Sequence, residues 1–142
     1  MKVVVDLNIL IDVLQQREPF FSASAKVCDL ISNGRCEGVV AAHSVTTLFY
    51  IIHRCADWRS ADVAFEWMLS TFKVAPADKS VFLAARALGF SDFEDAVVAA
   101  TAAANLCDFI VTRNLNDFSQ STVPAVAPEE MIELCKDSPS RH

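Results

Sequence analysis

Acidic residues that lie near a second acid or near amide or hydroxyl side chains occur at three places that are far apart in the chain. In chain order these residues are Asp6 with Asn8, Asp92 with Asp95, and Asp117 with Thr112 and Asn114. Carboxylates that gather in one partly dry site repel one another, which raises their pKa values or requires a cation. Mg²⁺ and Mn²⁺ prefer carboxylate and water oxygens, and they can activate a water for attack on a phosphodiester. If the fold brings the three places together, these residue types predict metal-assisted hydrolysis.

The pattern of apolar segments predicts a fold that could do this. Apolar runs at 3–5, 38–42, 72–75, 109–112 and 123–126 have the length and composition of strands, and segments with apolar residues at helical spacing lie between them. The last run contains Pro124, which suits an edge strand. Continuously apolar strands that alternate with helices indicate an α/β fold of three layers, α/β/α, around a mainly parallel sheet of four or five strands. Ligands of such sheets bind beyond the carboxyl ends of the strands, where the first and third acidic segments lie.

The composition indicates one well-packed domain. The chain has 142 residues, of which 53% are hydrophobic and 21% are charged, with only 3 Gly and 5 Pro. We therefore predict a single domain over residues 1–136 and a flexible C-terminal tail over 137–142. The five cysteines are widely spaced and include no C-x-x-C pair, which favours reduced thiols in the core over disulfides or a zinc site.

Charge and hydropathy restrict the partners. The net charge of −6 gives no overall electrostatic signature of nucleic-acid binding, so an RNA substrate would need a local basic patch. Apolar segments stay well short of the roughly 20 residues that cross a bilayer, and Asp6 interrupts any signal-like start. We expect a cytoplasmic protein that does not contact a membrane.

The acids at 6, 92 and 95 also have purely structural interpretations. Asp6 can cap the helix that follows it. Ser91 and Glu94 fit an S-x-x-E capping box, which would make Glu94 structural and leave Asp95 free to face the sheet edge. In the alternative frame Asp92 is the N-cap and Asp95 the third helical residue, and both acids are structural.

Other polar residues near this edge also allow a structural role. Asp117 can bind a metal or simply end a loop before Phe118. Asp12 lies one turn beyond Asn8 and is predicted to be a solvated helix residue. His43 follows the second predicted strand, but a single histidine without a partner motif is more often ordinary structure.

Taken together, three segments of the chain resemble the PIN-domain family. They are residues 3–12 (VVVDLNILID), 92–96 (DFEDA) and 110–118 (IVTRNLNDF), with 44–50 (SVTTLFY) between the first two. The resemblance spans nearly the whole chain and favours the branch that includes toxins of toxin–antitoxin pairs. It implies endoribonuclease activity with Mg²⁺ or Mn²⁺, frequent homodimers and inhibition by a small antitoxin protein.

Position by position, the resemblance also implies the site residues. Those that look like metal-binding and catalytic acids are Asp6, Asp95 and Asp117, with Asp92 as a further candidate ligand. Those that look like their hydrogen-bonding supports are Asn8, Thr47, Thr112 and Asn114.

One departure from the family pattern keeps other functions open. Many PIN nucleases carry a glutamate in the helix after the second strand, where this chain has Thr46, Thr47 and Tyr50 but no acid. The first alternative is therefore a catalytically weakened PIN-like module that binds RNA or protein. A Mg²⁺-dependent phosphoacceptor signalling domain is a weaker alternative, because no lysine closes the fourth or fifth predicted strand.

Overall fold

A computed structural model describes residues 1–137 of the chain. Its sheet has five strands, in the order β3-β2-β1-β4-β5, and every neighbouring pair is parallel. The strands are β1 (Lys2–Val5), β2 (Glu37–Ala41), β3 (Lys73–Ala75), β4 (Phe109–Val111) and β5 (Ala125–Val126). The predicted parallel α/β sheet is confirmed, and β5 lies at an edge, as Pro124 indicated.

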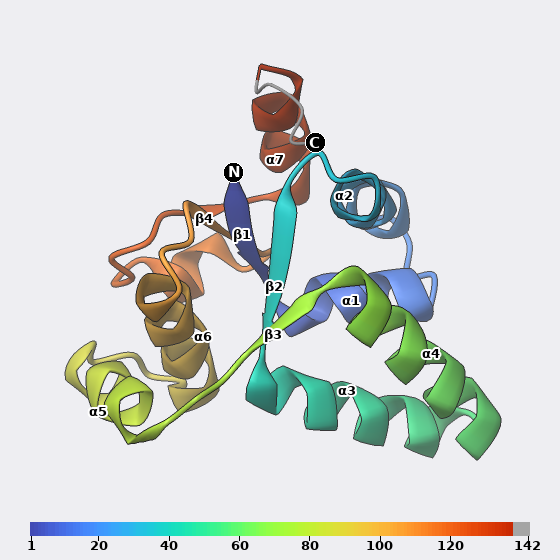
Figure 1. Ribbon diagram of the computed structural model, residues 1–142, viewed down its shortest axis with the longest axis horizontal. Helices are drawn as coiled ribbons and strands as arrows, with labels where there is room; N and C mark the ends of the chain where they lie inside the picture. The colour runs from blue at the N-terminus through green and yellow to red at the C-terminus, as the bar shows by residue number, and fades with distance from the viewer. Residues whose placement is uncertain (138–142) are drawn as a thin grey trace.

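The helices form layers on both faces of this sheet. They are α1 (Leu7–Leu14), α2 (Phe21–Ser32), α3 (Ala42–Cys55), α4 (Trp58–Thr71), α5 (Lys79–Ala87), α6 (Phe93–Ala104), the 3-10 helix η1 (Leu115–Phe118) and α7 (Pro128–Lys136). Figure 1 shows α1 to α4 and α7 on one side of the sheet and α5 with α6 on the other. The three-layer α/β/α architecture is therefore confirmed.

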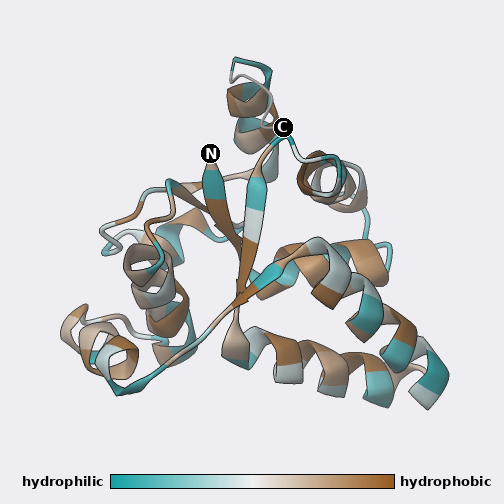
Figure 2. Cartoon of the chain, in the orientation of Figure 1, coloured by the Kyte–Doolittle hydropathy of each residue, from teal (hydrophilic) through white to brown (hydrophobic). Residues whose placement is uncertain are grey.

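The central strands are buried on both faces because their residues alternate between two apolar clusters. Val3 and Val5 of β1 pack with the cluster under α1 to α4, while Val4 packs with the cluster under α6. All three are at most 1% exposed, and complete burial of such a side chain contributes roughly 1.5–3 kcal/mol. Figure 2 shows the apolar colour along the strands and on the inner sides of the helices.

Gly38 allows close packing in the middle of the sheet. A Cβ atom on this residue of β2 would lie 2.7 Å from Ile31 Cγ2 and 2.9 Å from Phe72 Cδ1. Only a residue without a side chain therefore lets α2 and the residue before β3 approach β2 so closely.

Two helices begin without a side-chain cap. Helix α3 begins at Ala42 directly after β2, and Ser44 is buried within its first turn. Helix α2 begins at Phe21, and Ser24 is buried. Tertiary packing of these segments outweighs local capping preference.

The remaining general predictions have mixed outcomes. Four of the five free cysteines are buried, but Cys55 is exposed, so its expected place in the core was wrong. Asp137 follows α7 directly, and the rest of the predicted tail lies outside the described residues. Within residues 1–137, no helix combines the length and hydropathy needed to span a bilayer.

Candidate active site

Asp6 stands at the carboxyl end of the central strand β1. Its carboxylate is 5% exposed and accepts hydrogen bonds from Thr112 Oγ1 at 2.8 Å and from the Leu7 backbone N–H at 2.9 Å. The second bond makes Asp6 the N-cap of α1, as the structural interpretation required. Burial raises the pKa of Asp6, while these two hydrogen bonds and the nearby Arg113 charge lower it.

Thr112 connects the end of β4 to Asp6. It is fully buried, donates to Asp6 Oδ2 and accepts from the backbone N–H of Asn114 at 3.0 Å. Asn114 thus contacts this network through its backbone, and Asn8 lies partly buried in the first turn of α1. The supporting roles of these residues remain predictions.

Asp92 and Asp95 open α6, on the other face of the sheet. Asp92 is the N-cap, because its Oδ1 accepts from the Asp95 backbone N–H at 3.2 Å; the capping box that began at Ser91 was wrong. Asp95 nevertheless lies within electrostatic reach of the other acids. Burial and, in order of size, the charges of Asp92, Asp6 and Asp117 raise its pKa to about 7. At the start of α6, Asp92 therefore caps the helix, while Asp95 interacts electrostatically with the acids at the sheet edge.

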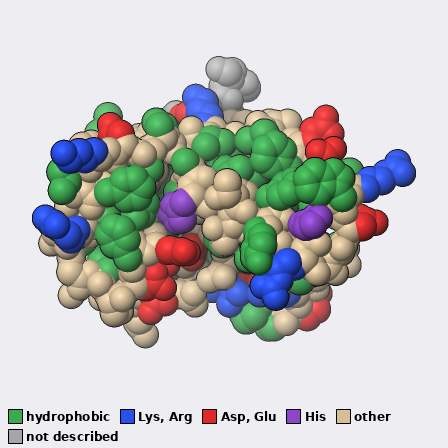
Figure 3. Space-filling view, turned by 90° about the horizontal axis from the view of Figure 1, so that it is seen from below, with side chains coloured by type: hydrophobic (Ala, Val, Ile, Leu, Met, Phe, Trp, Pro, Cys, Tyr) green, Lys and Arg blue, Asp and Glu red, His purple; other side chains and the backbone are tan. Residues whose placement is uncertain are grey.

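Asp117 lies in η1, beyond β4, and is exposed. Its charge raises the pKa values of both Asp6 and Asp95, so the three acids lie within electrostatic reach of one another. Figure 3 views the molecule from the side on which the strands end, and acidic side chains gather near the middle of that face beside a histidine. The acids that are distant in sequence therefore come from three elements to one edge of the sheet.

The donor types at this edge suit a hard divalent cation. Among the described residues, no three His, Cys, Asp or Glu side chains are close enough to hold a metal ion as they stand. Mg²⁺ typically keeps several waters and needs only one or two direct carboxylates, so acids at wider spacing can hold it partly through water. Burial is the largest cause of the raised pKa of Asp95, and the negative charges of Asp92, Asp6 and Asp117 raise it further, which a nearby cation would offset.

The start of α3 adds His43, for which a structural role was expected. Burial lowers its pKa, and the charges of Glu94 and Asp6 oppose that shift, so His43 lies near the acidic edge. Its Nδ1 is buried without a hydrogen-bond partner among the described residues. The position of His43 after the second strand placed it near this edge, but its acidic neighbours come from α6 and from the end of β1, so the local sequence could not identify them.

The threonines of α3 hold the first turn of their own helix. Thr46 Oγ1 and Thr47 Oγ1 both donate to the His43 carbonyl, at 3.1 and 3.0 Å. The Thr47 hydroxyl is therefore used inside α3 and does not hydrogen-bond to an acid of the edge. Tyr50, which belongs to the same stretch without an acid, is 59% exposed.

Asp12 is not the solvated residue that its sequence position suggested. Its side chain is 0% exposed and accepts from Arg113 Nε at 2.6 Å and Nη2 at 3.1 Å, with Ser24 Oγ at 3.5 Å. The Arg113 guanidinium also lies over the Phe20 ring, 3.9 Å from its centroid. This ion pair ties α1 to the residue that follows Thr112, and local sequence gives no signal for so distant a partner.

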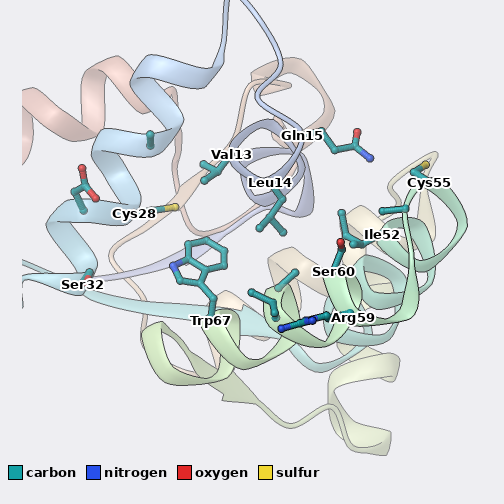
Figure 4. Close-up of a pocket in the computed structure, with 15 residues that line it drawn as sticks. Val13, Leu14, Gln15, Cys28, Ser32, Ile52, Cys55, Arg59, Ser60 and Trp67 are labelled. Carbon is teal, nitrogen blue, oxygen red and sulfur yellow. The ribbon is translucent and has the colours of Figure 1, made fainter.

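An apolar groove lies away from the acidic edge. It has a volume of about 820 Å³ and is lined by residues of α1, α2, the end of α3 and α4. Figure 4 shows its lining, which includes Leu14, Cys28, Ile52 and Trp67, with Arg59 and Ser60 at one side. Its lining suits an apolar segment of another chain better than a charged substrate.

The fold and the acids at its carboxyl edge define a class of protein. A family model described as PIN domain matches residues 2–116, and the chain belongs to this family. None of the curated proteins with which the sequence was compared matches it.

Several solved structures share the fold at low sequence identity. VapBC2 from Rickettsia felis, bound to a DNA fragment from its promoter, is 13% identical with a TM-score of 0.72, and the match covers 89% of this chain and 98% of that one. A toxin–antitoxin complex from Klebsiella pneumoniae is 21% identical with a TM-score of 0.68, covering 89% and 97%. VapC20 from Mycobacterium tuberculosis, a sarcin-ricin loop cleaving toxin, is 12% identical with a TM-score of 0.63, covering 76% and 86%.

Proposed function

We propose that this protein is a divalent-metal-dependent endoribonuclease and the toxin of a toxin–antitoxin pair. The observation that carries the proposal is the electrostatic coupling of Asp6, Asp95 and Asp117 at the carboxyl edge of a PIN-domain sheet. Burial and the charges of neighbouring acids oppose the ionisation of Asp95, and such a carboxylate favours a proton or a bound cation. The structural neighbour VapC20 is a toxin that cleaves the sarcin-ricin loop, which supports RNA as the substrate class of this chain.

The residues of this site would have different roles. Asp6, Asp95 and Asp117 would hold Mg²⁺ or Mn²⁺, with Asp92 close enough to add negative charge. The bound ion would offset phosphate charge and activate a water for attack on the phosphodiester. Thr112 and the Leu7 N–H fix the Asp6 carboxylate, so that it need not be ordered when the ion and the substrate arrive.

An antitoxin would bind mainly through the apolar groove. Two of the structural neighbours are toxin–antitoxin assemblies, which supports a protein partner for this chain. The groove offers Leu14, Ile52 and Trp67 to a helix with an apolar face. In α4, Val63 lines the groove and is 60% exposed, so a Val63→Glu substitution tests the surface. The substitution should abolish co-purification with a short DNA-binding protein encoded beside the gene.

A homodimer stays a prediction of the family resemblance, and sedimentation of the free protein tests it.

A catalytically weakened binding module is the second candidate. Helix α3 contributes threonine hydroxyls that hydrogen-bond to its own backbone and an exposed Tyr50, but no acid in this stretch. With less negative charge at the edge, the affinity for a cation would be lower. In that case the protein would bind RNA or protein without turnover.

Cleavage of a panel of single-stranded RNAs separates the two candidates. The wild type should cleave RNA with Mn²⁺, and EDTA should stop this cleavage. The Asp95→Asn variant should cleave more than about 100-fold more slowly than the wild type. Asp57→Asn is the matched control, because Asp57 is an exposed N-cap of α4 and Asn also caps helices well. Cleavage that ignores both EDTA and Asp95→Asn would reject the mechanism, and binding without cleavage would favour the module.

A further inference from the structure

We propose that a pair of exposed phenylalanines beside the acidic edge, Phe82 of α5 and Phe93 of α6, is a base-stacking subsite for single-stranded RNA. This inference rests on the proposed ribonuclease function, because it specifies how the substrate of that site is held. The subsite would place the chain of the RNA across the start of α6, next to Asp95.

The two rings are exposed although the helices that carry them are well packed. Phe82 is 44% exposed and Phe93 is 49% exposed. Their centroids are 6.5 Å apart and their planes differ by 17°, so the rings are nearly parallel. Below them, α5 and α6 are joined by a separate apolar cluster that consists of Val81, Ala85, Ala96, Val97 and Ala100. The packing of the two helices therefore leaves much of both rings available to a ligand.

Basic residues flank the rings on α5. Lys79, Phe82 and Arg86 follow one another at intervals of three and four residues, which places them on one face of the helix. Lys79 and Arg86 are exposed, and neither forms a salt bridge with an acid of the described residues. They provide the local basic patch that the overall charge of −6 otherwise lacks.

The position of Phe93 connects this patch to the proposed chemistry. Phe93 is the first residue of α6 and lies between the N-cap Asp92 and the coupled acid Asp95. In Figure 3, hydrophobic side chains cover the left part of the face, basic ones lie at its outer margin, and acidic ones lie toward the centre. A strand of RNA that binds Lys79 or Arg86 of α5 would pass Phe82 and Phe93 on its way to Asp95.

The chemistry of the patch favours single-stranded nucleic acid. Proteins that bind single strands combine a basic path for phosphates with aromatic rings on which successive bases stack. A base-paired duplex keeps its bases stacked inside and could not offer their faces to Phe82 and Phe93. A second copy of the chain would use the apolar rings but would not require flat aromatic surfaces, and this difference can be tested.

The binding test uses a fluorescently labelled oligouridylate and the Asp95→Asn protein, which removes cleavage from the measurement. In this background, Phe82→Leu and Phe93→Leu should each weaken binding by about tenfold, because leucine keeps apolar area but cannot stack. Phe93→Trp should retain or improve the affinity. Trp58→Leu is the matched control: Trp58 is 64% exposed and lies on α4, across the sheet, so RNA affinity should not change.

A charge test does not depend on the rings. Lys79→Gln with Arg86→Gln should weaken binding and reduce the slope of log affinity against log salt by about 1.4, which corresponds to two phosphate contacts to a single strand. Both residues are exposed, so the variant should fold, as circular dichroism can verify.

The outcomes distinguish this inference from the proposed function. With Asp95 intact, the phenylalanine variants should raise KM for RNA cleavage and leave kcat unchanged. Unchanged RNA affinity in both leucine variants would overturn the subsite, even if the protein is a nuclease. The subsite would also be overturned if the leucine variants changed from dimer to monomer without losing RNA affinity, because the rings would then join two copies of the chain. Weaker binding in the variants of a protein that cleaves no RNA would retain the subsite and reject the nuclease.

Discussion

Replacing Asp12 with Asn should destabilise the fold, because it breaks a buried ion pair without changing side-chain volume. Asp12 is 0% exposed, and its carboxylate accepts two hydrogen bonds from Arg113. Asparagine removes the negative charge and turns an NH₂ donor toward a guanidinium that can only donate. The Arg113 charge would then lie against α1 without its partner.

The size of this effect follows from the exposure of the two partners. Removing one partner of a fully buried ion pair lowers the free energy of unfolding by about 3–5 kcal/mol. The Arg113 side chain is 22% exposed and lies over Phe20, so it can recover part of its hydration. We therefore expect the free energy of unfolding to fall by about 2–3 kcal/mol, equivalent to roughly 10 °C in Tm for a domain of this size.

Urea unfolding followed by circular dichroism measures this change. Asp62→Asn is the control, because Asp62 is exposed on α4 and should alter stability by less than about 0.5 kcal/mol. The double variant Asp12→Leu with Arg113→Met removes both charges and should be more stable than Asp12→Asn. If Asp12→Asn lost no more stability than Asp62→Asn, the ion pair would not be the link that we describe.

Three further predictions concern the edge and the packing. Thr112→Val should lower the free energy of unfolding, measured with urea, by about 1 kcal/mol. It should also raise the pKa of Asp6, because the lost hydrogen bond from Thr112 favoured the ionised carboxylate; an NMR titration of the Asp6 carboxyl group measures this pKa. The pKa of Asp95 is about 7 in the folded protein and 3.8 for the free side chain. Between these pH values the folded state therefore binds more protons than the unfolded state. As a result, Asp95 makes the free energy of unfolding fall as the pH rises from 3.8 to about 7. In EDTA, Asp95→Asn should therefore be more stable than the wild type at about pH 8, with a smaller difference at about pH 5; equal slopes would contradict this. Gly38→Ala should lower the free energy of unfolding by roughly 1–3 kcal/mol, since its Cβ would lie 2.7 Å from Ile31, and an unchanged Tm would show that the neighbours move freely.

Much of the fold was predictable because its signals are local. Continuous apolar runs such as 3–5 and 109–112 indicated buried parallel strands, and Pro124 indicated an edge. Helix starts were less predictable. The α3 segment becomes helical directly after β2 although Ala41 offers no capping side chain, because packing on the sheet compensates for the missing cap.

The candidate site was predictable as a set of acids but not as a set of contacts. The rule that ligands bind beyond strand ends brings Asp6 and Asp117 together without any knowledge of side-chain positions. The partners of Asp12 and His43 lie on other elements, so their burial and their contacts depend on the tertiary fold. For the same reason, the stacking of Phe82 on Phe93 could not be inferred from either helix alone.

A crystal soaked with Mn²⁺ tests the central claim most directly, with data collected to show anomalous scattering from manganese. We predict a manganese peak at the carboxyl edge of the sheet, about 2.2 Å from an oxygen of at least one of Asp6, Asp95 and Asp117. The other carboxylates should contact the ion directly or through its waters, and the peak should be lost in Asp95→Asn. A peak elsewhere, or none at a saturating concentration, would contradict the account.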